Sequence, residues 1–85
     1  MLTAKDLNKY REIIMRAVEG MGRDDIGIGE VSEKEHGVLA VEFSRGTHSS
    51  IETVPTDALQ DRVQTNQAIL RAIGAFSKTL ARSHD

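Results

Sequence analysis

The sequence predicts an α+β protein with the element order α-β-β-β-α: a three-stranded antiparallel meander packed by an N-terminal helix and a longer C-terminal helix. Apolar residues recur at helical spacing near both ends of the chain and alternate with a period of two in its middle. The connections between these segments are short, which favours a meander. At 85 residues, the chain is expected to form one domain, 1–85, with one modest core.

The first helix is predicted to start at Thr3, which is a suitable N-cap residue. Asp6, three residues later, stands where a capping box has an acidic side chain. Gly20 and Gly22 supply the stop. The apolar residues of this segment share one helical face, formed by Leu7, Tyr10, Ile14, Ala17, Val18 and Met21.

The first strand is predicted from the alternation that follows this helix. Ile26 and Ile28 lie on one face of the strand, and Gly27 and Gly29 lie on the other. Residues 33–37 are polar and end in a glycine, so we expect them to connect the first strand to the second.

The second strand, residues 38–43, is apolar on both faces at its start, as is typical of a central strand. One face holds Leu39, Val41 and Phe43, and the other holds Val38, Ala40 and Glu42. The third strand is predicted over residues 49–54, and Pro55 ends it.

A second, longer helix is predicted from Thr56 or Asp57 to about Arg82. Its residues follow alternating steps of four and three, which is a heptad-like seam formed by Leu59, Val63, Asn66, Leu70, Ile73, Ser77 and Leu80. Ile69 and Phe76 widen this stripe in the second half of the helix.

The wide stripe and the sheet together predict a homodimer. A three-stranded sheet offers one face to two helices and leaves the other face uncovered, here with Gly27, Gly29, Val38 and Ala40. Contiguous apolar surface of this kind usually marks an interface. The dimer forms through this face or through the second helix, whose candidate interface residues are Asn66, Ile69, Ile73, Phe76 and Leu80. The alternative is a monomer in which both helices wrap further round the sheet.

Residues 44–50 carry many hydroxyl groups around a histidine and an arginine. Arg45, Thr47 and His48, with the backbone amides of the turn, are the candidate contacts for a small anion. The alternative is a β-turn whose polar side chains satisfy its own backbone.

No catalytic residues are predicted in this segment, and no enzymatic activity is expected. His48, Ser50 and Glu52 fall on one face of the third strand. Successive residues on one face of a strand are about 6.6 Å apart, which we judge too far for a relay of hydrogen bonds.

No cofactor and no metal site is predicted. The pair Gly27-x-Gly29 lacks the third glycine and the following helix of a dinucleotide-binding loop. His36 has acidic neighbours, but a turn beside a solvated acidic strand explains them better than a metal site does.

The composition indicates the cellular compartment in which the protein is expected to work. The chain has no cysteine, which excludes disulfides, thiolate zinc sites and cysteine nucleophiles. It has no apolar run long enough for a signal peptide or a membrane span. We therefore expect a cytoplasmic protein that makes no membrane contact.

The charge distribution disfavours a partner dominated by phosphate. The net charge is −2, and residues 23–54 carry seven Asp or Glu against three Lys or Arg. Arg71 and Lys78 lie seven residues apart on the second helix, away from its seam, and are the candidate DNA contacts. A solvated helix face is the alternative for these two residues.

The segment 37–59 resembles small bacterial nucleoid-associated proteins of the YbaB type. The likeness consists of a glycine, an alternating strand, a polar turn, a third strand that ends near a proline, and a final helix. The element order α-β-β-β-α is also similar. This resemblance implies a homodimer that binds DNA with little sequence preference.

The function predicted from the sequence is therefore non-enzymatic binding of another protein, by a chain that forms a homodimer. DNA binding through the bases of the second helix is the first alternative. Binding of a small anion or ligand at the 44–50 turn is the second.

Overall fold

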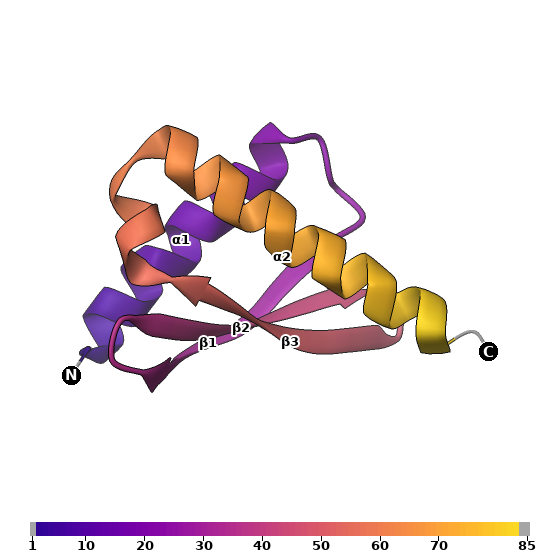
Figure 1. Ribbon diagram of the computed structural model, residues 1–85, viewed down its shortest axis with the longest axis horizontal. Coiled ribbons are helices and arrows are strands. Elements are labelled where there is room, and N and C mark those ends of the chain that lie inside the picture. The colour runs from indigo at the N-terminus through magenta and orange to yellow at the C-terminus, as the bar shows by residue number, and fades with distance from the viewer. Residues whose placement is uncertain (1, 84–85) are drawn as a thin grey trace.

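The computed structural model describes residues 2–83, with the side chains of residues 2–81. Its elements, shown in Figure 1, are α1 (Ala4–Gly20), β1 (Gly27–Glu35), β2 (Val38–Arg45), β3 (His48–Pro55), a 3-10 helix η1 (Thr56–Gln60) and α2 (Arg62–Ser83). The strands form one antiparallel sheet in the order β1-β2-β3. The predicted α+β class, element order, meander and longer C-terminal helix are confirmed.

Helix α1 begins with the predicted capping box. The Thr3 hydroxyl accepts a hydrogen bond from the Asp6 backbone N–H at 3.2 Å, and the Asp6 carboxylate accepts one from the Thr3 N–H at 3.2 Å. The hydrogen bond from the Thr3 backbone N–H is the main cause that holds the pKa of Asp6 below its ordinary value, because it favours the charged carboxylate. Two turns further on, Ile14 and Val18 are buried against the sheet.

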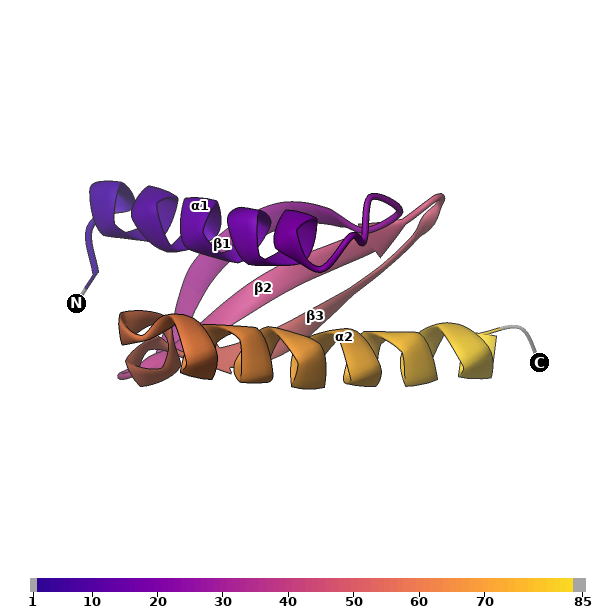
Figure 2. The same ribbon diagram turned by 90° about the horizontal axis from the view of Figure 1, so that it is seen from above.

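Both helices cover the same face of the sheet, as Figure 2 shows. The core lies between them and the sheet, where β2 contributes three side chains that are fully buried, Leu39, Val41 and Phe43. The predicted core face of the central strand is thus confirmed. Within the described residues no helix covers the other face of the sheet (Figure 1). Gly27, Gly29, Val38 and Ala40 lie on that face as expected.

The first strand departs from simple alternation at a β-bulge. Ile28 pairs with Phe43 but Val31 pairs with Val41, so β1 has one more residue than β2 in this interval. The extra residue returns Val31 to the core face, where it is buried. Strict alternation from Ile28 would have placed Val31 on the uncovered face.

The connection between β1 and β2 is shorter than predicted. Strand β1 continues to Glu35, and only His36 and Gly37 form the turn. Gly37 has a φ of 81°, a left-handed conformation that glycine adopts without steric cost. The prediction of a polar loop over 33–37 was therefore wrong, because alternating polar residues at a sheet edge also fit a strand.

Gly29 makes room for an acidic side chain on the uncovered face. A Cβ atom at this position would overlap the carboxylate of Glu42 on the neighbouring strand. That carboxylate also accepts a hydrogen bond from the Glu30 N–H at 3.4 Å. The glycines of β1 therefore serve close approach within the sheet.

Helix α2 starts later than predicted. Residues Thr56–Gln60 form η1, and the α-helix begins at Arg62. A carboxylate oxygen of Asp61 accepts the Val63 N–H at 3.2 Å and so caps this new start. No helix within the described residues is long and apolar enough to span a membrane.

The face of α2 that packs on the sheet also differs from the predicted seam. Val63 and Leu70 are 62% and 58% exposed. The buried residues of this helix are Thr65, Ile69, Ala72, Ile73 and Phe76. The heptad-like spacing misplaced the centre of the stripe, because a helix lying on a sheet needs no 3.5-residue repeat.

Three predicted dimer contacts therefore lie in the core of the chain itself. Ile69, Ile73 and Phe76 are at most 4% exposed, and the Phe76 ring stacks on Phe43 with a centroid separation of 6.0 Å. These side chains are already covered, so their assignment to a dimer interface was wrong. Of the other two predicted contacts, Asn66 is exposed and Leu80 is half-buried.

We predict that Ile69→Val lowers the free energy of unfolding by about 1 kcal/mol, because it removes a fully buried methylene. The neighbouring Leu70→Ala removes more atoms but is expected to cost less than about 0.5 kcal/mol, because Leu70 is exposed. Urea unfolding followed by circular dichroism measures both. A larger loss for Leu70→Ala would contradict the assigned core face of α2.

Candidate functional site

The 44–50 segment forms the tight turn between β2 and β3. Arg45 pairs with His48, and the two residues between them are Gly46 and Thr47. Gly46 has a φ of 63°, whereas Thr47, like every described residue other than glycine, does not have a positive φ; this is the pattern of a type II′ hairpin turn. Thr47 and His48 are exposed in this hairpin.

The cation of this turn already has an anionic partner. Arg45 Nε lies 3.3 Å from a carboxylate oxygen of Asp25, in the loop before β1. Arg23 Nε donates to the other carboxylate oxygen at 3.2 Å. The hydrogen bond from Arg23 is the main cause that holds the pKa of Asp25 below its ordinary value. Arg45 thus ties the hairpin to the preceding loop, which weakens the anion-binding hypothesis.

One part of the prediction for the third strand is wrong: side chains two positions apart on it can form a hydrogen bond. The Ser50 hydroxyl donates to a Glu52 carboxylate oxygen at 2.8 Å. Residues two positions apart on a strand do meet here, because the glutamate side chain spans the step between them. The pair lies on the face of β3 that is turned toward the helices, opposite to Ile51.

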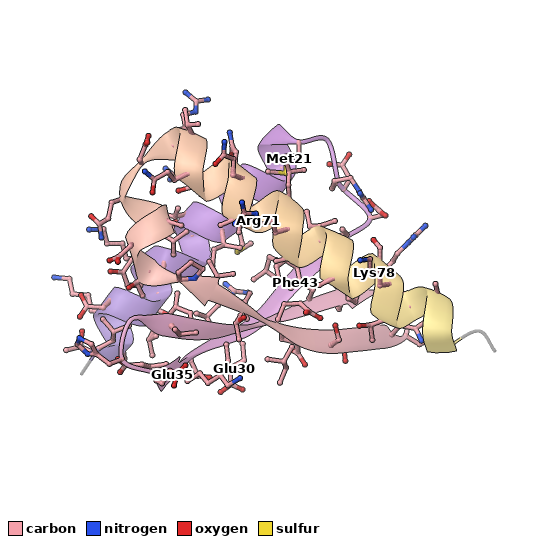
Figure 3. The ribbon with its side chains drawn as sticks, viewed as in Figure 1. Met21, Glu30, Glu35, Phe43, Arg71 and Lys78 are labelled. Atoms are coloured by element: carbon pink, nitrogen blue, oxygen red, sulfur yellow. The ribbon has the colours of Figure 1, made fainter. Side chains whose placement is uncertain are left out.

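The other predicted contacts lie apart from this turn. Arg71 and Lys78 are both exposed on α2, and Figure 3 shows them on the same side of that helix. His36 is exposed at the opposite end of the sheet from the β2–β3 turn. Within residues 2–83, no three histidine or acidic side chains gather as a metal site would require.

One edge of the sheet, that of β1, is shielded by α1. The Arg11 side chain donates from Nε to the backbone oxygen of Gly29 at 2.9 Å and from Nη2 to that of Ile28 at 3.0 Å. The backbone N–H of Leu2 donates to the Glu33 carboxylate at 3.0 Å. The Arg11 bonds and the neighbouring bulge occupy the part of the edge at Ile28 and Gly29 where another strand would pair.

The other edge, that of β3, has no such protection among the described residues. Its eight residues pair with β2 in continuous register without a bulge. In an antiparallel ladder, residue pairs that are hydrogen-bonded alternate with pairs that are not. The Thr56 N–H donates to the Gly37 oxygen at 3.0 Å, so the even-numbered residues of β3 are the ones that bond to β2. The N–H and C=O groups of Ser49, Ile51 and Thr53 consequently point outward from the sheet.

The acidic side chain along this edge is that of Glu52, which is turned toward the helices. Strand β3 has no lysine or arginine, and proline occurs only at its end. Ile51, in the middle of the strand, is 67% exposed, which is the highest value among the large hydrophobic side chains described. An exposed and regular edge strand with an isoleucine at its centre is a surface on which another strand can pair.

A hollow lies directly beside this edge. Its volume is about 360 Å³, and it is formed by Thr53 and Pro55 of β3, by Ala58, and by α2 residues that include Ala68 and Arg71. Alternate side chains of an added strand would project toward this space. The β3 edge and the hollow together are the candidate functional site.

No role of the β3 edge was predicted from the sequence. The feature of the sequence that could have indicated one is the lack of basic residues between His48 and Pro55. That signal has meaning only once the strand order places β3 at an edge. Comparisons of the chain with protein-family models, curated proteins and solved structures found no match.

We predict that Asp25→Asn destabilises the protein at neutral pH, because Arg23 and Arg45 lose their charged partner. The folded-state pKa of Asp25 lies below its ordinary value of 3.8, so its contribution is complete above that pH and is lost as the pH falls through the folded-state value. The difference between the two proteins in chemical unfolding should therefore shrink in acid. A difference that stays constant from neutral pH to pH ~2 would contradict this account.

Proposed function

We propose that this protein acts by protein binding at the β3 edge, and that the bound strand is β3 of a second copy. The homodimer then has a continuous six-stranded antiparallel sheet. The observation that carries this proposal is the difference between the two edges. Arg11 and a bulge occupy the β1 edge, whereas β3 presents a regular edge with an exposed isoleucine.

The main chain supplies the first part of the binding energy. Outward N–H and C=O groups of Ser49, Ile51 and Thr53 can exchange hydrogen bonds with the same groups of a second copy. Each such bond contributes about 0.5–1.5 kcal/mol net. Strand addition at a free edge is an established mode of protein recognition.

The side chains of β3 are compatible with self-pairing. In the antiparallel register that centres on Ile51, this residue meets Ile51 of the second copy, and both lose contact with water. The same register places Glu52 opposite Ser50 of the second copy. A register centred on Glu52 would set two carboxylates opposite each other, which is unfavourable.

The hollow beside β3 supports the same arrangement. The two-fold axis of such a dimer is perpendicular to the sheet, so both copies of α2 lie on the same face and near the axis. Ala58 and Ala68 give the hollow a small apolar lining, and Arg71 lies at its rim. Side chains of the second copy would enter this space and add to the area buried between the strands.

We predict that Thr53→Pro converts a dimer into a monomer, because proline removes an outward N–H without breaking the β2–β3 ladder. Thr53→Val is the matched control, since it keeps the N–H and should stay dimeric. Ile51→Lys should also give a monomer, because a lysine at an edge opposes strand pairing. Sedimentation velocity over a concentration series measures all three variants.

Two outcomes would overturn the proposal. The first is a wild-type chain that sediments as a monomer at the highest concentrations reached. The second is a dimer that persists in both Thr53→Pro and Ile51→Lys. A gel-shift titration with duplex DNA tests the alternative of DNA binding through Arg71 and Lys78, for which steep salt dependence is diagnostic.

A further inference from the structure

A second hollow lies on the other side of α2, between this helix and α1. Its volume is about 430 Å³, within the range of small-molecule sites. The second half of α1 forms one wall, and the segment from Leu59 to Asn66 forms the other. Figure 3 marks Met21 at the end of α1, which lines this hollow. The β3 edge does not contribute to it.

The inner part of this hollow is apolar. Ile13 and Ala17 of α1 and Met21, which follows this helix, are half-buried there, and Leu59 is buried. Thr65 also lines it, but its hydroxyl lies 2.9 Å from the Ala58 oxygen and 2.8 Å from the Asp61 oxygen. The hydroxyl is therefore used within the chain. Gln60 and Asn66 are exposed and add amide groups to the lining.

The mouth of the hollow is cationic. Arg16 of α1 and Arg62 of α2 both line it and are exposed. Among the side chains described, residues 2–81, neither arginine has a carboxylate partner within ion-pair distance. Asp61 is the one acidic residue of the lining, and one of its oxygens accepts the Val63 N–H.

We infer that this hollow binds a small amphipathic carboxylate. The apolar tail lies against Ile13, Ala17 and Leu59, and the carboxylate lies between Arg16 and Arg62, whose guanidinium groups match its planar geometry. Two arginines and Asp61 give the mouth one net positive charge. That balance suits a monoanion better than a doubly charged phosphate.

Octanoate is the probe, and isothermal titration is the measurement. Octanoate should bind and should raise the melting temperature with its concentration, whereas octylamine should do neither. The double variant Arg16→Gln/Arg62→Gln should bind octanoate at least about tenfold more weakly, which corresponds to a loss of about 1.4 kcal/mol. Lys9→Gln is the matched control, because this exposed cation of α1 lies outside the lining of the hollow, so its loss should leave binding unchanged.

A second variant tests the apolar part of the hollow separately from the two arginines. Ala17→Leu fills the apolar part, is compatible with a helix and should abolish octanoate binding while both arginines remain. Thr53→Pro should bind octanoate like the wild type, because the site is independent of the β3 edge. Absence of octanoate binding, equal binding of octylamine, or unchanged binding in the double variant would overturn the inference.

Discussion

The large, fully buried side chains of the described residues lie on one side of a three-stranded sheet, and this one-sided core constrains the rest of the structure. Phe43 of β2 and Phe76 of α2 stack at its centre. Two helices on one face leave the other face and both sheet edges without a covering layer (Figure 2). The chain protects one of these edges with Arg11, whose guanidinium takes the place of a neighbouring strand at Ile28 and Gly29. The β3 edge is therefore where a further strand can pair with the sheet.

The placement of α2 links the two proposed binding surfaces. This helix rests on the sheet through one stripe, and a hollow lies along each of its flanks. The flank toward β3 adjoins the free edge and suits an added strand. The flank toward α1 has an apolar interior and two arginines at its mouth, and it suits a small carboxylate. One helix thus separates the proposed surface for protein from the proposed surface for a small molecule, and each can be altered without the other.

Features that depend on neighbouring residues could be predicted from the sequence. The capping box of Thr3 and Asp6 and the core face of β2 are of this kind, because a few adjacent residues determine them. The bulge before Val31 was missed, because a period-two pattern does not show where a strand takes an extra residue. The buried face of α2 differs from the predicted one for a similar reason. The apolar stripe of this helix is wide, and the sheet determines which part of it is buried. The candidate site depends on strand order and on a contact between Arg11 and residues far along the chain, and neither is local.

Hydrogen exchange at the backbone amide of Ile51, followed over a dilution series, tests the central claim most directly. The N–H of this residue points away from β2, so nothing within the described part of one chain protects it in the sheet. We predict slow exchange at high protein concentration and fast exchange on dilution, with the same trend at Thr53 and no change at Val41 in the central strand. Fast exchange of Ile51 at every concentration would contradict the account, because a free β3 edge would then remain unpaired.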